Sequence, residues 1–202
     1  MMIQGVSIRD MINQSIAVMT KPSVSTFEEY ERRGGQREAF TYVGTAAAIA
    51  AVVALLFGLL SGIGYAVLAG GGAFIAPLIG FFITGLLVYH IGKSQGGTGS
   101  QDEVYYTLSL FMAPILAING AVGNIPLLAC LALPLTLALG IYQIYLGYLG
   151  IRSSMNLEQN KAIITMVAAW IAQALIGAVI GGIVAAIAVA MGVATGSVQL
   201  GQ

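Results

Sequence analysis

The sequence is short of charged residues. Only 8% of its 202 residues are Asp, Glu, Lys or Arg, while 58% are hydrophobic. Soluble globular domains carry about 25% charged residues, which keep their surfaces in contact with water. A soluble domain is therefore excluded, and the composition predicts an all-α polytopic membrane protein.

Cysteine and histidine are nearly absent as well. Cys130 is the single cysteine and lies in an apolar tract, so neither a disulfide framework nor a cysteine-based metal site can be built. His90 is the sole histidine, and its place near the end of an apolar tract is typical of an interfacial polar group. We expect no catalytic site, no bound metal and no cofactor.

Five apolar tracts are long enough for a helix to cross a bilayer core, which takes about 20 residues. We expect a transmembrane bundle over 39–202 after a cytosolic or interfacial helical segment over 1–38. The turn between the first two helices is placed only within 61–73, where Ser61-Gly62-Ile63-Gly64 and Gly70-Gly71-Gly72 are the two possible breaks. The last tract is longer than one bilayer core, so a hairpin broken at Gly181-Gly182 is the alternative to one helix. The five helices are expected at 40–60, 66–91, 104–121, 127–151 and 162–191.

The N-terminal segment predicts two short helices. Residues 6–20 repeat apolar side chains at helical spacing, and this helix either packs on its own bundle or lies in the membrane interface. Lys21-Pro22 ends it, because the residue before proline is pushed out of the helical region. Ser25 and Glu28 then fit a capping box for a helix over 26–33. The apolar residues of the first helix are Ile8, Met11, Ile12, Ile16 and Met19.

Charge is confined to one side of the five-helix arrangement. The N-terminal segment and the loops after the second and fourth helices hold all 8 cations and all 8 acids. The positive-inside rule then predicts a cytoplasmic N-terminus and an external C-terminus, in the plasma or inner membrane if the source is prokaryotic. The candidate cytoplasmic contacts and lipid anchors are Arg32, Arg33, Arg37, Lys93, Arg152 and Lys161.

Small residues mark candidate packing faces within the tracts. Glycines spaced four apart let helix backbones approach closely where burial from water provides no driving force. They serve either packing within the chain or self-association. The two pairs are Gly58 with Gly62, and Gly177 with Gly181.

The interiors of the tracts contain amides and no ionisable groups. A proton relay or ion path usually places Asp, Glu, Lys or Arg inside the membrane, and none lies away from the tract ends. Asn119, Gln143 and Gln173 are the candidate intramembrane polar residues. The two glutamines are expected to hydrogen-bond between helices.

A polar, glycine-rich stretch at 92–106, GKSQGGTGSQDEVYY, separates the second and third tracts. A phosphate-binding loop needs G-x-x-x-x-G-K-[ST] after a strand, whereas Lys93 precedes the glycines and the flanking segments are membrane helices. Nucleotide binding is therefore not expected, and no nucleic-acid surface is visible.

Three features together resemble the Yip family of small polytopic membrane proteins, over residues 15–190. The first is a proline followed five residues later by a phenylalanine. The second is similar to the family's K-x-x-G-G-x-G-[ST] stretch before an apolar helix with a proline. The third is a tyrosine-containing helix that leads to a glycine- or asparagine-Leu…Lys-Ala segment. Here these are Pro22 and Phe27; 93–100 with Pro114; and Tyr142 and Tyr145 with Asn156-Leu157 and Lys161-Ala162.

The resemblance implies five helices and a cytosolic N-terminus. Eukaryotic members of the family look like adaptors for small GTPases and vesicle membranes. This chain has Gly35-Gln36-Arg37-Glu38 where those members carry Asp-Leu-x-Gly-Pro, so it looks more like the prokaryotic branch. GTPase binding is therefore not carried over to it.

We expect a non-enzymatic integral membrane protein that organises the bilayer or other proteins through its cytoplasmic face, as a scaffold or accessory protein. Its partners would be the lipid bilayer and other membrane proteins or further copies of itself. The alternative is a transporter or channel for a neutral or weakly polar solute. Broken helices at Pro77, Pro114 and Pro134 would then line its path with Asn119 and Gln143.

Overall fold

The structure is a computed structural model that describes residues 5–190, without the side chains of residues 129, 180, 181 and 183–190. Two short helices precede five long ones, and within the described range five helices are long and apolar enough to cross a membrane. The prediction of an all-α, five-span membrane protein is confirmed. The helices are α1 (Ile8–Thr20), α2 (Val24–Tyr30), α3 (Gln36–Gly58), α4 (Ile63–Ser94), α5 (Gln101–Asn124), α6 (Ala129–Ser154) and α7 (Gln159–Ala190).

Helices α3 and α5 start several residues before their apolar tracts do. At α3, the Gly35 N–H donates to the Glu38 carboxylate at 3.0 Å. At α5, Ser100 and Glu103 form a capping box, in which the Ser100 N–H donates to Glu103 Oε2 at 2.7 Å. Side chains that satisfy free N–H groups extend each helix beyond its hydrophobic stretch. The expected starts at residues 40 and 104 are therefore replaced by Gln36 and Gln101.

The turn between α3 and α4 lies at Gly62, after the 3₁₀ turn Leu59–Ser61. Gly62 has φ +110°, a backbone conformation that residues with a Cβ rarely adopt. The second break considered at Gly70–Gly72 is absent, because these residues continue α4.

The remaining helices run unbroken through their glycines and prolines. Gly181-Gly182 lies inside α7, so the hairpin alternative was wrong. Pro77, Pro114 and Pro134 lie within α4, α5 and α6, none of which is interrupted there. The broken helices expected for a transport path are therefore absent from the described chain.

Two expectations for the N-terminal segment need correction. Helix α2 is capped by Ser23, whose hydroxyl accepts from the Thr26 N–H at 3.1 Å, and Ser25 does not cap it. On α1, the face against the bundle is not the isoleucine stripe. That face contains Met11, Gln14, Ser15 and Val18, while the outward stripe contains Ile8, Ile12 and Ile16, which are 38%, 45% and 56% exposed.

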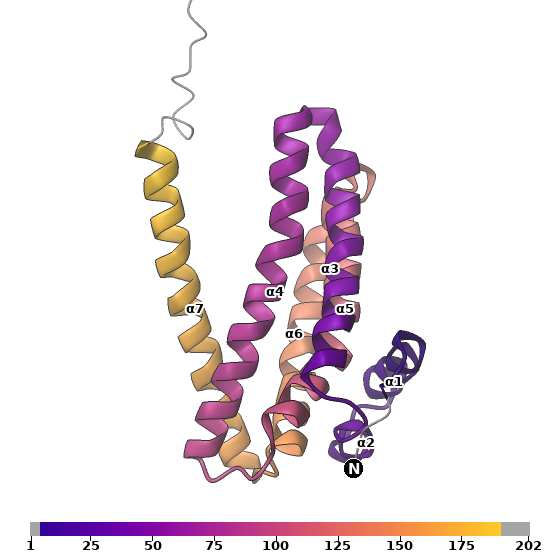
Figure 1. The fold of residues 1–202 in the computed structure, drawn as a ribbon, viewed down its shortest axis with the longest axis vertical. Coiled ribbons are helices and arrows are strands. Elements are labelled where there is room, and N and C mark those ends of the chain that lie inside the picture. Colours follow the sequence, from indigo (N-terminus) through magenta and orange to yellow (C-terminus); the bar gives the residue numbers. More distant parts are fainter. Residues whose placement is uncertain (1–4, 191–202) are drawn as a thin grey trace, which may run out of the picture.

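The long helices alternate in direction, and α1 and α2 lie beside the end of the bundle where α3 begins (Figure 1). We call this end the charged end, because every charged residue of the chain lies in α1, α2, a loop at this end or an adjoining helical turn. The largest fully buried side chains include Tyr105, Tyr106 and Phe27, which lie in or next to it. Helix α7 packs on α4 and α6, and the C-terminal part of α7 leans away from α4 (Figure 1).

Candidate functional site

The N-terminal cap, which we define as α1 and α2, is held on the bundle by buried and part-buried polar contacts. The Tyr106 hydroxyl on α5 donates to Gln14 Oε1 at 2.8 Å. The hydroxyls of Ser15 and Tyr42 lie 3.0 Å apart, and the Tyr142 hydroxyl donates to the Met19 carbonyl. A buried hydrogen bond fixes orientation, because leaving either partner unpaired is costly. The cap therefore has one defined position on α3, α5 and α6.

Phe27 anchors α2 by apolar contact. Its side chain is fully buried, and its ring meets Phe111 of α5 edge to face with 6.2 Å between centroids. Gly150 of α6 completes the site, since a Cβ there would lie 3.8 Å from the Phe27 ring. A side chain from the segment just before the first span thus reaches the core between α5 and α6.

Glu31, just after α2, is a buried carboxyl group with a mixed environment. It is 4% exposed, and Ser153 of α6 donates its hydroxyl to Glu31 Oε2 at 2.5 Å. Arg32 Nε lies 3.0 Å from Glu103 Oε1 and 3.6 Å from Glu31 Oε1. Burial raises the pKa of Glu31 above its ordinary value of 4.5, while the Ser153 hydrogen bond opposes the rise. This cluster joins the cap to the ends of α5 and α6.

The predicted cations do not form one cluster. Arg32 and Arg33 are paired, the latter with Glu29 at 3.1 Å. Lys93 donates to the Thr98 carbonyl at 3.2 Å. Arg152 contacts the Tyr148 hydroxyl at 3.4 Å. The exposed Arg37 and Lys161 have no ion-pair partner within residues 5–190.

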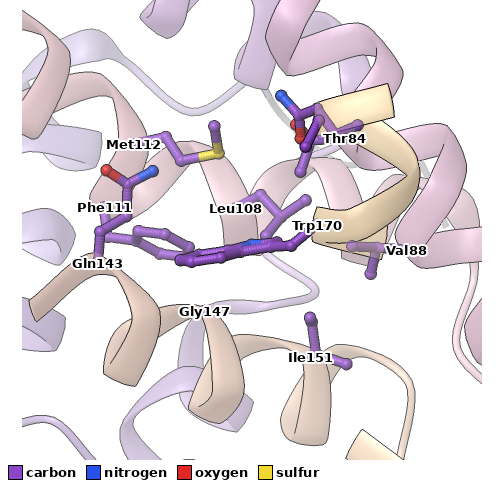
Figure 2. A pocket seen from close by; sticks show the side chains of 11 residues that line it. Thr84, Val88, Leu108, Phe111, Met112, Gln143, Gly147, Ile151 and Trp170 are labelled. Carbon is purple, nitrogen blue, oxygen red and sulfur yellow. The ribbon is translucent and has the colours of Figure 1, made fainter. Parts of the chain in front are cut away.

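The predicted intramembrane amides meet around two adjoining cavities between the long helices. The first, about 320 Å³, is bounded by α4, α5, α6 and α7, and Figure 2 shows Thr84, Met112, Gln143 and Trp170 around it. The second, about 250 Å³, is lined in part by Asn119. Gln143 and Gln173 line both cavities.

The amides pair only in part. The Thr84 hydroxyl lies 2.6 Å from Gln173 Oε1 and 2.7 Å from the Gly80 carbonyl. Asn119 and Thr136 are 3.5 Å apart, which is a weak contact. Gln143 does not bond to Gln173, although the two share a cavity. Across the described residues, no group of three or more His, Cys, Asp or Glu side chains could hold a metal ion.

A comparison with protein-family models matches residues 16–181 to the Yip1 domain. The chain belongs to the Yip1 domain family. This match confirms the resemblance seen in the sequence. No curated protein and no solved structure matches the chain.

The glycine-rich loop of this Yip1 domain ties α4 and α5 to the end of α6. The Thr98 N–H donates to the Met155 carbonyl at 3.0 Å, and Asn156 Nδ2 donates to Thr98 Oγ1 at 3.1 Å. A Cβ built at Gly99 would lie 1.6 Å from the Ser154 carbonyl oxygen, so only glycine fits. Gly96 has φ +89°. The loop is therefore a packing element of the Yip1 domain.

Asn156 explains a second motif of the Yip1 domain. It follows α6 with φ +52°, in the left-handed region that glycine and asparagine tolerate best. The Leu157 N–H then donates back to the Arg152 carbonyl at 3.1 Å, which closes the helix end. Leu157 is 5% exposed and Ala162 is fully buried. The glycine-rich loop and the Asn156-Leu157 segment, two motifs of the resemblance, thus meet at the charged end.

The predicted glycine pairs have different surroundings in this Yip1 domain. A Cβ at Gly58 would lie 2.8 Å from Ala66 Cα, so Gly58 lets α3 approach α4. A Cβ built at Gly62 or at Gly177 would meet no atom within 4 Å, and Gly181 lies outside the described side chains. Sequence reasoning missed three glycines that contact large side chains or another helix. They are Gly34 on Tyr106, Gly85 on Tyr105 and Gly120 on Ala50.

Proposed function

We propose that this Yip1 domain protein is a non-enzymatic membrane-organising or accessory protein that contacts other proteins through its charged end. The observation that carries the proposal is the distribution of ionisable groups. All 16 charged residues, 8 cations and 8 acids, lie at that end, and no described span carries one away from its terminal turns. Specific docking between proteins uses charge and hydrogen bonds, which this end alone offers in quantity.

The same distribution supports a cytoplasmic charged end. The 8 cations all fall in segments that alternate to one side of the five spans. Positive residues near the ends of membrane helices are retained on the cytoplasmic side. The N-terminus would then be cytoplasmic, and α7 would run outward.

The cap supports the proposal by presenting a fixed surface. Its inner face is packed, while Asn13, Lys21 and Glu28 are exposed. The isoleucine stripe of α1 lies between its packed and polar faces, an arrangement typical of a helix at the membrane interface. A partner would therefore meet a surface held next to the bilayer.

Surface probes test the proposal better than deletion of the cap, because deletion would uncover the packing sites of Met11 and Phe27. Photo-crosslinking residues would replace Asn13 and Glu28, singly, in cells. Matched controls at the opposite end are Leu60 and Leu127, which are 77% and 87% exposed. We expect one defined protein adduct from the charged end only. Equal adducts from both ends would contradict the proposal.

Orientation is tested separately by thiol labelling. In a Cys130→Ala background, Glu28→Cys should react with a membrane-impermeant maleimide only after the cells are opened. Leu127→Cys should react in intact cells. The reverse pattern would place the charged end outside.

The cavities favour a second candidate, transport of a neutral or weakly polar solute. Asn119, Gln143 and Gln173 lie around them. Saturable flux in proteoliposomes, abolished by Gln143→Leu, would support it. No flux across a broad solute panel would count against it.

A further inference from the structure

The cavity bounded by α4–α7 has unused hydrogen-bond donors. The Thr84 hydroxyl has one proton, for which Gln173 Oε1 at 2.6 Å and the Gly80 carbonyl at 2.7 Å are alternative acceptors, and the Gln173 amide N–H groups have no partner among the described residues. The Gln143 amide likewise makes no hydrogen bond to a described side chain or backbone group. At this depth in a bilayer, water does not reach lipid-facing groups, so unmatched N–H groups are costly.

The rest of the lining is apolar and uncharged. On the α4 and α5 sides, the first cavity is lined by Val88, Leu108, Phe111 and Met112. Neither cavity is lined by an ionisable side chain. A charged ligand would remain unpaired there, at a high cost in free energy. An apolar molecule with a hydrogen-bond acceptor suits both the walls and the free donors.

The cavity reaches the lipid-facing surface at Trp170. This side chain lines the cavity and is 39% exposed, and its neighbour Ile171 is 57% exposed. Figure 2 shows Trp170 of α7 on the same cavity as Phe111 and Thr84. A ligand dissolved in the bilayer can therefore enter sideways, past α7, without passing through water.

We propose that this cavity binds an uncharged lipid through a carbonyl group, which accepts hydrogen bonds from Gln143 and Gln173 while its chain lies along Phe111, Met112 and Trp170. The volume of about 320 Å³ is at the small end of the range for ligand sites, about 300–1,000 Å³. It accommodates the carbonyl and part of one chain. The carbonyl can come from an acyl ester or from a prenylquinone.

Trp170 provides the assay, because it is the single tryptophan of the chain. The full-length protein would be placed in phosphatidylcholine nanodiscs and its fluorescence measured against increasing mole fractions of brominated diacylglycerol. Brominated phosphatidylcholine reports contact of Trp170 with bulk lipid. A prenylquinone, which quenches directly, is the second arm and separates the two sources of the carbonyl.

We expect saturable quenching by one neutral probe at mole fractions where brominated phosphatidylcholine quenches weakly and linearly. Gln143→Leu should raise the half-saturating mole fraction about five- to tenfold, as expected for one lost hydrogen bond. Ala174→Phe, which fills the cavity, should abolish saturation. Leu175→Phe is the matched control, since Leu175 is 63% exposed and outside the lining, and should leave it unchanged.

Three results would overturn the proposal. One is that both neutral probes quench Trp170 no more strongly than brominated phosphatidylcholine does. The other is strong quenching by aqueous acrylamide that neither neutral probe relieves, which would show a water-filled cavity. Identical curves for Ala174→Phe and Leu175→Phe would also place any saturable binding elsewhere.

Discussion

Replacing Phe27 by alanine should release the N-terminal cap from the bundle while the five spans stay folded. The side chain is fully buried between α5 and α6 and stacks edge to face on Phe111 at 6.2 Å. Truncation of a buried phenylalanine costs about 3–5 kcal/mol. If this cost falls on the docking of the cap alone, a loss of about 3 kcal/mol raises the population of molecules with an undocked cap about a hundredfold.

Hydrogen exchange followed by mass spectrometry measures this directly. Amides in α1 and α2 should lose about two orders of magnitude of protection in Phe27→Ala, while amides in α4 keep theirs. Phe74→Ala is the matched control, because Phe74 is 40% exposed on α4. Unchanged exchange in α1 and α2 of Phe27→Ala would refute the conclusion that Phe27 anchors the cap.

Three further predictions concern the charged end. Because burial raises the pKa of Glu31, the contribution of Glu31 to docking of the cap is fully present below pH 4.5 and is lost as the pH rises through the raised pKa. The hydrogen-exchange protection of α2 should therefore increase when the pH is lowered from neutral, and Glu31→Gln should remove this dependence. Gly99→Ala should lower the free energy of unfolding by about 2 kcal/mol or more, because its Cβ would strike the Ser154 carbonyl, whereas Gly140→Ala, with open space around it, should be neutral or stabilising in the same thermal unfolding assay. Asn156→Ala should cost about 1–2 kcal/mol in that assay and Asn156→Gly less, and equal losses would contradict the left-handed conformation as the cause.

The membrane spans could be predicted from the sequence, because each segment that crosses the hydrocarbon core must by itself be long and apolar. Their ends could not, since Gln36 and Gln101 are polar, and the helices begin there with the help of cap contacts that include the carboxylates of Glu38 and Glu103. The Gly70–Gly72 run looked like a break, but membrane helices tolerate glycine and the left-handed turn is at Gly62.

The site was predictable in its residue types and unpredictable in its pairings. Gln143 and Gln173 were recognisable as amides in apolar tracts. Their common cavity depends on how α6 and α7 pack, which no local pattern encodes. Similarly, α1 turns Gln14 and Ser15 inward because Tyr106 and Tyr42 offer hydrogen bonds from distant helices, against the apolar periodicity of α1 itself.

The mass of the intact complex, extracted gently from native membrane, tests the central proposal most directly. The proposal predicts a foreign subunit at fixed stoichiometry. That subunit should be lost in the double variant Arg37→Glu, Lys161→Glu, which alters two exposed cations of the charged end, and retained in Leu127→Ala at the other end. A bare monomer or homo-oligomer from unaltered protein would contradict it.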